Sequence, residues 1–359
     1  MRIAIVHDAL CVSGGAERMA VWLARSFPQA PVYTSVYLPE KTFAEFKTLQ
    51  VNTLPFARLI KSERHFKLLY PLWYFLIQRN DFRDFDVVLS SSTYLAKFIR
   101  PVASVRHVCY LYAPFRLLWK PESYTPESLP TRGAATSLVK RVIPLLGRWD
   151  LKRTREIPKL ATTCRNMADE ILKVYHMPAE VIYPPVEMPP KIVTGQREDY
   201  YISVSRLISH KRVDLAVKAC TRLRKQLVVV GDGPEKDRLI QMAGDTVHFA
   251  GRVSDEQLQR LYRGARGLIF PSYEDYGIVP LEAQAWGVPV IAFGRGGVLE
   301  TIQEGVSGIF FGQQDEDSLV EGITRFEKNH FDVKRIRDWA AGFNVEKFMA
   351  KIRQFVQAP

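Results

Sequence analysis

The regular alternation of short β-branched apolar runs with amphipathic segments constrains this chain more than any other feature. The first run, Arg2 to Asp8, predicts a buried strand, and a Ser13-Gly14-Gly15 loop separates it from a helical pattern over Ala16 to Phe27. Further strands are predicted over residues 32–36, 87–90, 105–112, 201–206, 226–230, 247–251, 267–271 and 288–293. Strands that alternate with helices in this way predict an α/β fold with parallel sheets.

A cluster of prolines interrupts this alternation near the middle of the chain. Pro184-Pro185 and Pro189-Pro190 lie within a few residues of each other, which is typical of an interdomain linker. A chain of 359 residues with 47% hydrophobic content can form two cores. We therefore predict a first doubly wound domain over 1–186, a second over 187–331 and a C-terminal helix within 332–359.

Almost all of the net positive charge comes from the first half of the sequence. Residues 1–186 contain 26 Lys and Arg against 15 Asp and Glu, a difference of +11, whereas the remainder contains 24 against 23, a difference of +1. This asymmetry indicates an anionic partner for the first half. No nucleic-acid motif is present, so an anionic membrane surface is the partner we expect, and nucleic acid is not.

Two segments of the first half are candidates for that contact. The segment 65–79 mixes aromatic, aliphatic and basic residues, which suits either a membrane interface or a buried core helix. Between 131 and 155 seven basic residues accompany a single acid, Asp150. We expect a cytoplasmic protein that is peripheral on the inner face of the cytoplasmic membrane, because no apolar run reaches the roughly 18 residues of a spanning helix and no leader pattern precedes the first strand.

Several loops that follow predicted strands suit a phosphate-bearing ligand. Gly14 and Gly15 allow close backbone approach at a helix N-terminus, although a simple connecting turn explains them equally well. Arg206 and Lys211 place two cations after the first strand of the second domain, where they can stabilise a departing diphosphate. Gly231, and Arg252 with Val253, follow the next two strands and suit the approach of a base and its ribose.

The most informative loop runs from Pro271 to Glu282. Tyr273 and Glu274 precede a glycine turn, and Glu274 can accept hydrogen bonds from sugar hydroxyls. The amides of Gly277, Ile278 and Val279 are suited to a phosphate, and Glu282 lies about one turn into the following helix, within reach of a ribose. These residues sit where ligands bind parallel sheets, beyond the carboxyl ends of the strands.

Together these motifs resemble the retaining glycosyltransferases of the GT-B fold, in particular family 4 (group 1). The resemblance rests on the segments 14–17, 205–207 with Lys211, 231–233, and above all 274–282, and it covers nearly the whole chain. It implies two Rossmann-like domains that face a cleft, with the donor in the second, the acceptor in the first, and the last helix crossing back to the first.

The resemblance also implies roles for single residues. Arg206 and Lys211 would hold the diphosphate, Glu274 the sugar and Glu282 the ribose, and Gly15 would approach the diphosphate from the first domain. Many relatives place a histidine beside the transferred sugar, and here Tyr112 stands at that position. His107, five residues earlier, is the alternative, although a lone histidine near a strand is more often structural.

The expected reaction is therefore transfer of a hexose from a nucleotide diphosphate sugar, with retention and without a metal or other cofactor. UDP-glucose and GDP-mannose remain alternative donors, and a lipid-linked saccharide of surface polysaccharide biosynthesis is the expected acceptor. A non-catalytic nucleotide-sugar-binding subunit and a nucleotide-sugar epimerase of the same architecture are the alternative functions. A nicotinamide dehydrogenase fits less well, because the first glycine loop lacks the full dinucleotide fingerprint.

Overall fold

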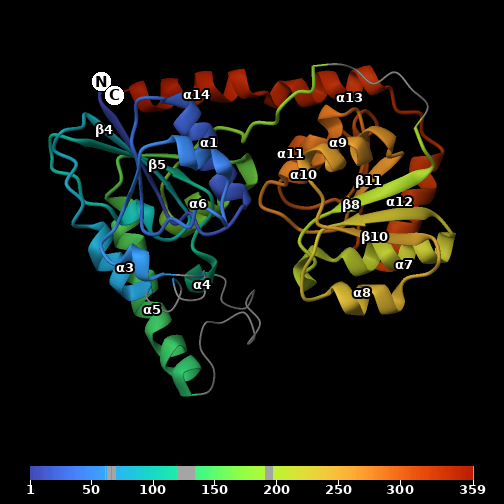
Figure 1. Cartoon of the computed structure of the whole chain (residues 1–359), viewed down its shortest axis with the longest axis horizontal. Coiled ribbons are helices and arrows are strands. Elements are labelled where there is room, and N and C mark those ends of the chain that lie inside the picture. Colours follow the sequence, from blue (N-terminus) through green and yellow to red (C-terminus); the bar gives the residue numbers. More distant parts are fainter. Residues whose placement is uncertain (61, 63–65, 67–69, 120–133, 191–196, 359) are drawn as a thin grey trace. The chain divides into compact units, whose positions relative to one another are not determined.

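The computed structural model describes residues 1–60, 62, 66, 70–119, 134–190 and 197–358 (Figure 1). Contacts divide the chain into two compact units: the first comprises Met1–Tyr183 with Phe348–Pro359, and the second comprises Pro184–Lys347. The division falls three residues before the predicted boundary at 186. Each unit is an α/β layer structure, as the alternation predicted.

The first unit contains a seven-stranded parallel sheet in the order β3-β2-β1-β4-β5-β6-β7. The strands are β1 (Ile3–His7), β2 (Val32–Thr34), β3 (Val51–Thr53), β4 (Val87–Ser92), β5 (Arg106–Leu111), β6 (Lys159–Thr162) and β7 (Glu180–Val181). The helices are α1 (Gly15–Ser26), α3 (Tyr70–Ile77), α4 (Arg116–Trp119), α5 (Ala134–Arg155) and α6 (Arg165–Tyr175). Short 3-10 turns include η2 (Ala57–Leu59) and η3 (Ala96–Phe98).

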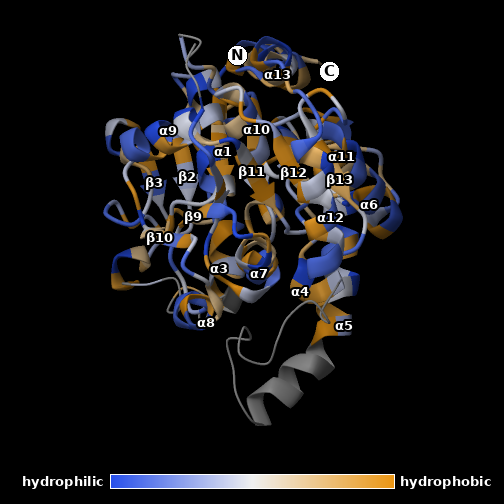
Figure 2. Cartoon of the chain, turned by 90° about the vertical axis from the view of Figure 1, so that its right-hand side faces the viewer, coloured by the Kyte–Doolittle hydropathy of each residue, from blue (hydrophilic) through white to orange (hydrophobic). Residues whose placement is uncertain are grey.

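The second unit contains a six-stranded parallel sheet in the order β10-β9-β8-β11-β12-β13. Its strands are β8 (Tyr200–Val204), β9 (Gln226–Val230), β10 (Val247–Gly251), β11 (Gly267–Phe270), β12 (Val290–Phe293) and β13 (Gly308–Phe311). Its helices are α7 (Val213–Leu223), α8 (Lys236–Met242), α9 (Asp255–Gly264), α10 (Ile278–Ala285), α11 (Val298–Thr301), α12 (Glu316–Glu327) and α13 (Val333–Ala340). The central strands are almost wholly apolar because both of their faces are covered (Figure 2).

Both sheets have the Rossmann strand order, in which the chain starts in the middle, builds outward to one side and then returns to build the other side. The order reverses between β1 and β4 in the first unit and between β8 and β11 in the second. Ligands of open parallel sheets bind outside the carboxyl ends of the strands at such a switch point. This topology directs attention to the loops that follow these four strands.

Asp8 fixes the switch point of the first unit. Its buried carboxylate accepts hydrogen bonds from the Ser92 hydroxyl at 2.7 Å and from the four amides of residues 93–96 at 2.6–3.1 Å. Backbone amides satisfy a buried carboxylate well, because each donates a charge-assisted hydrogen bond. The end of β1 is thereby tied to the turn that follows β4.

The expected C-terminal helix over Asp332–Val356 is in fact two helices, α13 and α14 (Val345–Gln357). The Asn344 side chain caps the second helix by accepting from the Lys347 amide at 2.9 Å, just as Asp332 caps α13 by accepting from the Arg335 amide at 2.7 Å. The break lies in the segment 341–344, so α13 belongs to the second unit and α14 joins the first unit from Phe348 onward.

Candidate active site

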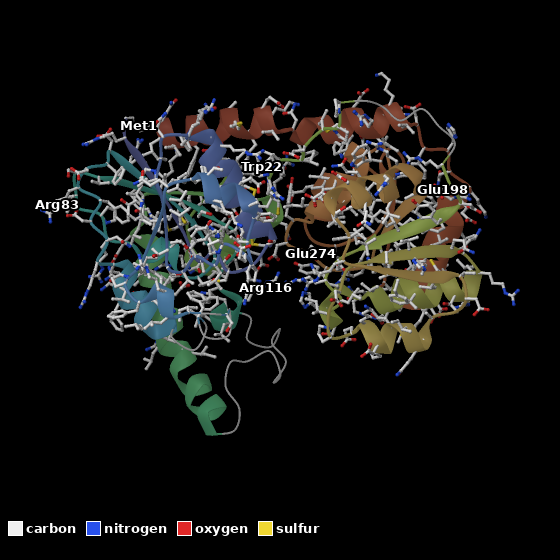
Figure 3. The ribbon with its side chains drawn as sticks, in the orientation of Figure 1. Met1, Trp22, Arg83, Arg116, Glu198 and Glu274 are labelled. Carbon is white, nitrogen blue, oxygen red and sulfur yellow. The ribbon has the colours of Figure 1, made fainter. Side chains whose placement is uncertain are left out.

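The loops on either side of the second unit's switch point meet through Lys211 and Glu274. Lys211 ends a 3-10 turn after β8, Glu274 lies in the loop after β11, and the Lys211 ammonium contacts the Glu274 carboxylate. Both side chains are mostly buried, with 18% and 24% of their surface exposed. Figure 3 shows Glu274 at the edge of the unit where the strands end and Glu198 at the opposite edge, where β8 begins.

Arg206 lies in the same loop as Lys211 but is exposed. Among the residues that the structure describes, its guanidinium has no hydrogen-bond or ion-pair partner. The backbone on either side is held firmly: the Ser205 amide donates to Val230 at 3.1 Å and the Leu207 amide donates to Asp232 at 3.0 Å. The loop thus presents an unpaired cation on a fixed backbone beside the ion pair of Lys211.

Glycines allow the loop after β9 to pack directly on this backbone. Gly231 has a φ of +134°, and a Cβ atom there would overlap the Ser205 carbonyl oxygen. A Cβ atom at Gly233 would likewise overlap the carbonyl oxygen of Leu207. The Gly231 amide also donates to the Gly251 carbonyl at 2.8 Å, which continues the packed series to the end of β10.

Arg252 and Val253 follow β10 and extend this edge. The Arg252 side chain is 85% exposed and lies 3.7 Å from the carboxylate of Asp232, while Val253 is half-buried. An ion pair so exposed contributes little to stability, so Arg252 is free to turn toward another anion.

The glycine turn before α10 has the conformation that its sequence suggested. Gly277 has a φ of +83° and caps α10, so the first-turn amides of Ile278 and Val279 have no intrahelical acceptor. Tyr273 lies at the start of the same loop with 39% of its surface exposed. These elements supply hydrogen-bond donors and an exposed ring close to Glu274 in the chain.

Glu282 lies on α10 and faces Tyr262 of α9. Burial and the nearby negative charge of Glu282 together raise the pKa of Tyr262 well above its ordinary value. Glu282 itself is only partly buried. Its carboxylate therefore lies beside a neutral phenol, and its predicted contact with a ribose stays a prediction.

The loop after β12, residues 294–297, completes this edge, and we did not predict its role from the sequence. The Gly297 amide donates to the Glu274 carbonyl at 3.0 Å. A Cβ atom at Gly296, where φ is +83°, would overlap the same carbonyl oxygen. The available signal was the sequence Gly-Arg-Gly-Gly directly after a predicted strand. This loop positions the backbone of Glu274.

In the first unit a chain of hydrogen bonds joins the ends of three strands. The His7 Nδ1 atom lies 2.9 Å from the Ser91 hydroxyl, Ser91 lies 2.8 Å from the Tyr112 hydroxyl, and Tyr112 donates to the Ala16 carbonyl at 3.2 Å. Ala16 lies in the first turn of α1, directly after Gly14 and Gly15. Tyr112 is thus brought beside the predicted phosphate loop of its own unit.

The protons available fix the direction of each hydrogen bond in the series from His7 to Ala16. The Ala16 carbonyl can only accept, so Tyr112 donates to it, Ser91 donates to Tyr112, and His7 donates from Nδ1 to Ser91. Burial lowers the pKa of His7 to about 4, even though the neighbouring Asp8 charge raises it, so His7 is neutral with its proton on Nδ1. Burial also raises the pKa of Tyr112 well above its ordinary value, so the phenol keeps its proton at neutral pH.

His107 lies away from Tyr112, near the opposite end of β5. It is the second residue of β5, where its Nε2 atom lies 2.8 Å from the Ser90 hydroxyl and burial lowers its pKa to about 3. Five residues of extended strand separate it from Tyr112, a distance of roughly 16 Å. His107 is therefore a buried, neutral, structural histidine.

Comparison with known proteins identifies the second unit. Residues 187–341 match the family model described as glycosyl transferases group 1. The segment is therefore similar to the group 1 glycosyl transferases, in agreement with the resemblance that the motifs carried.

Two curated proteins match part of this chain. An uncharacterized glycosyltransferase of Methanocaldococcus jannaschii is 33% identical over 138 residues, which are 36% of this chain and 35% of that protein. The GDP-mannose-dependent alpha-mannosyltransferase of Corynebacterium glutamicum is 38% identical over 107 residues, 30% of this chain and 26% of the relative. The matches thus span about a third or less of each relative.

Similarity over the whole chain is found in solved structures of GT-B glycosyltransferases. The Anabaena protein HepE in complex with UDP superposes with a TM-score of 0.71 over 100% of both chains, at 17% sequence identity. At this identity the likeness establishes the fold alone. The predicted GT-B fold class is confirmed.

Proposed function

We propose that this protein is a hexosyltransferase that transfers a sugar from a nucleotide diphosphate donor to an acceptor. The observation that carries the proposal is the contact of Lys211 with Glu274 across the switch point, with the unpaired Arg206 in the same loop. A diphosphate needs cations, and a sugar needs hydrogen-bond acceptors, so this edge offers both in one place. The glycine loops beside it pack directly on the backbone of Ser205, Leu207 and Glu274 and so fix the loops that carry both charges.

We assign the chemistry as follows. Arg206 and Lys211 stabilise the negative charge that develops on the diphosphate when its bond to the anomeric carbon breaks. They take the part that a metal ion plays in other transferases, so the reaction is metal-independent. Glu274 accepts hydrogen bonds from the sugar, and Glu282 accepts them from the ribose.

The stereochemical outcome that we propose is retention. The acceptor oxygen bonds to the anomeric carbon on the face that the diphosphate leaves, and its proton passes to a departing phosphate oxygen. This front-face route uses no protein nucleophile. Glu274 is held instead as a hydrogen-bond acceptor by its contact with Lys211.

Either UDP-glucose or GDP-mannose is the donor that we propose. The Anabaena structure in complex with UDP and the Corynebacterium relative named for GDP-mannose support one donor each. We further propose a lipid-linked saccharide acceptor in surface polysaccharide biosynthesis, at the inner face of the cytoplasmic membrane. The excess of basic residues in the first half supports an anionic membrane as the place of the reaction. In the described ranges, none of the helices has the length and hydropathy of a membrane span.

The experiment that tests catalysis is donor hydrolysis by the isolated chain, followed by proton NMR with each donor in turn. Water then stands in for the acceptor, and the anomer of the released hexose is read before it mutarotates. Release of the donor's own anomer supports a retaining transferase. Release of the opposite anomer contradicts retention, and the absence of hydrolysis despite donor binding favours a non-catalytic subunit.

A further inference from the structure

The outer face of α3 carries an unusual mixture of exposed side chains. Leu72 and Phe75 are 40% and 64% exposed, and Arg79, two residues beyond the end of α3 at Ile77, is also exposed. A spacing of three residues places Leu72 and Phe75 on one stripe of the helix. The opposite side of α3 is anchored in the core by Trp73, whose ring is wholly buried and whose Nε1 donates to the Phe66 carbonyl at 3.1 Å.

Helix α5 carries a second stripe of the same kind. Leu145 is 63% exposed, and Arg148 and Lys152 follow it at three and seven residues, both exposed. Its one acid, Asp150, points inward to an ion pair of 2.6 Å with the fully buried Lys97. Among the described side chains of α5, the outer stripe therefore begins with the apolar Leu145 and continues with basic residues.

The two helices are neighbours. The ring of Tyr74 on α3 packs edge-on against Trp149 on α5, with ring centroids 3.8 Å apart. Phe75 and Arg148 adjoin these two rings in the sequence. We call the six outer residues (Leu72, Phe75, Arg79, Leu145, Arg148 and Lys152) the α3/α5 face.

A second exposed apolar pair comes from the turn η2, upstream of α3. Phe56 and Leu59 are 63% and 71% exposed. Phe56 also has a φ of +66°, a conformation that costs a bulky residue free energy. Ala57 and Ile60 in the same turn share the core cluster of Trp73, so both segments cover one core and present apolar side chains outward.

We propose that the α3/α5 face docks on an anionic lipid surface, with Leu72, Phe75 and Leu145 inserted among the acyl chains and the basic side chains against the headgroups. Nucleic acid would use the charges but leave the apolar side chains in water. A lipid surface satisfies both, because Lys and Arg reach the headgroups while apolar neighbours are buried below them.

This inference deepens the proposed function, on which its choice of a membrane rests. It identifies how the chain would reach a lipid-linked acceptor and which helices would carry it there. Of the segment 65–79 the structure describes residues 66 and 70–79, where α3 buries one side in the core and exposes apolar side chains on the other.

The test is sedimentation of the full chain with vesicles of phosphatidylglycerol and phosphatidylcholine, and with phosphatidylcholine alone. We expect binding to the anionic vesicles that weakens with salt. Arg79→Ser, Arg148→Ser and Lys152→Ser together reduce the partition coefficient by roughly tenfold or more and flatten its salt dependence. Leu72→Ala with Phe75→Ala reduces it by roughly tenfold and leaves the salt dependence unchanged.

Matched controls remove equal charge or apolar area elsewhere. Lys218→Ser, Arg260→Ser and Lys351→Ser form the charge control, and Leu172→Ala with Ile240→Ala form the apolar control. All five positions are exposed. We expect the controls to bind vesicles like the unmodified chain and all variants to keep the same melting temperature.

Three results would overturn the proposal: no binding to anionic vesicles at low salt, equal losses in controls and face variants, or a dimer in sedimentation velocity that Leu72→Ala with Phe75→Ala dissociates. The last would assign the face to a second copy of the chain. Stabilisation of the same preparations by nucleotide sugars reports separately on the proposed donor site. Failure to bind vesicles with intact donor binding would therefore count against the docking surface alone.

Discussion

Lys211 contacts Glu274 although 63 positions separate them in the sequence. The two residues lie in the loops that follow β8 and β11, the pair of strands between which the sheet order reverses. The contact thus joins a cation to a carboxylate at the point where Rossmann sheets bind ligands.

The Lys211–Glu274 pair should act as a unit in donor binding. We expect Lys211→Ala and Glu274→Gln each to weaken donor binding, and the double variant to lose less than the sum of both. Calorimetric titrations of the four proteins with one donor give this coupling. Additive losses would show that the two residues act independently. Because 18% and 24% of the two side chains remain exposed, the free energy of unfolding should change by only about 1 kcal/mol in the single variants.

Removal of the unpaired cation should affect turnover without affecting the fold. Arg206→Ala is expected to lower donor turnover roughly 100-fold, because a fixed charge aimed at a developing anion contributes about 3 kcal/mol. Steady-state kinetics measures the loss, and the exposed Arg260→Ala serves as its control. Turnover within twofold of the unmodified chain would remove Arg206 from the mechanism.

Two glycine substitutions separate backbone strain from steric overlap. Gly251→Ala meets no atom within 4 Å and is strained only by its φ of +67°, so it should cost about 1–2 kcal/mol of unfolding free energy. Gly231→Ala also overlaps the Ser205 carbonyl and should cost clearly more. Urea unfolding of both variants gives the comparison, and equal losses would contradict the packing of the two loops.

Removing the Tyr112 hydroxyl tests the hydrogen-bond chain of the first unit. Tyr112→Phe should cost about 1 kcal/mol of stability and also lower turnover, since it frees the Ser91 hydroxyl and the Ala16 carbonyl beside the glycine loop. Tyr110→Phe is the matched control, because its hydroxyl donates to the Ile182 carbonyl at 2.6 Å in the same unit. We expect Tyr110→Phe to lower stability alone. A Tyr112→Phe variant with full turnover would assign that hydroxyl a purely structural role.

Buried neutral histidines should make the fold sensitive to mild acid. The pKa values of His7 and His107, about 4 and about 3, lie below the 6.5 of an unfolded histidine. Between pH 6.5 and 4 the unfolded chain therefore binds protons that the native state excludes, and the free energy of unfolding falls as pH falls. At pH 5 each histidine accounts for about 2 kcal/mol of this loss.

Urea unfolding at pH 7 and pH 5 measures the effect. His107→Gln keeps a donor toward Ser90 but does not titrate, so its loss between the two pH values should be smaller by about 2 kcal/mol. His7→Asn should behave in the same way. An undiminished loss in both variants would place the acid sensitivity elsewhere.

Much of this architecture was predictable because parallel strands are apolar on both faces and their ends carry polar or glycine-rich loops. The Ser254–Gln257 capping box illustrates the local rules, since both of its reciprocal hydrogen bonds are present. Strands β3, β6, β7 and β13, each of two to four residues, were missed. The break between α13 and α14 had a visible signal in Gly342 and Asn344.

The sequence indicated which loops lie at the candidate site but not which side chains contact each other. The direction of each strand placed Arg206, Lys211 and Glu274 at one edge, whereas their pairing depends on the tertiary fold. The separation of His107 from Tyr112 follows from the length of the extended strand between them, which a count of residues along the chain does not convey. The bonds from His7 through Ser91 to Tyr112 join three strands and have no local sequence signal.

The most direct test of the central claim is a thermal-shift titration of the chain, and of Arg206→Ala, with UDP-glucose, UDP-galactose, UDP-N-acetylglucosamine, GDP-mannose and the free nucleotides. A ligand that binds only the native state raises the melting temperature, by an amount that grows with the logarithm of its concentration divided by its Kd. We predict a selective rise with UDP-glucose or GDP-mannose and its nucleotide, which Arg206→Ala reduces. An unchanged melting temperature with every nucleotide and sugar donor would contradict the proposed donor site.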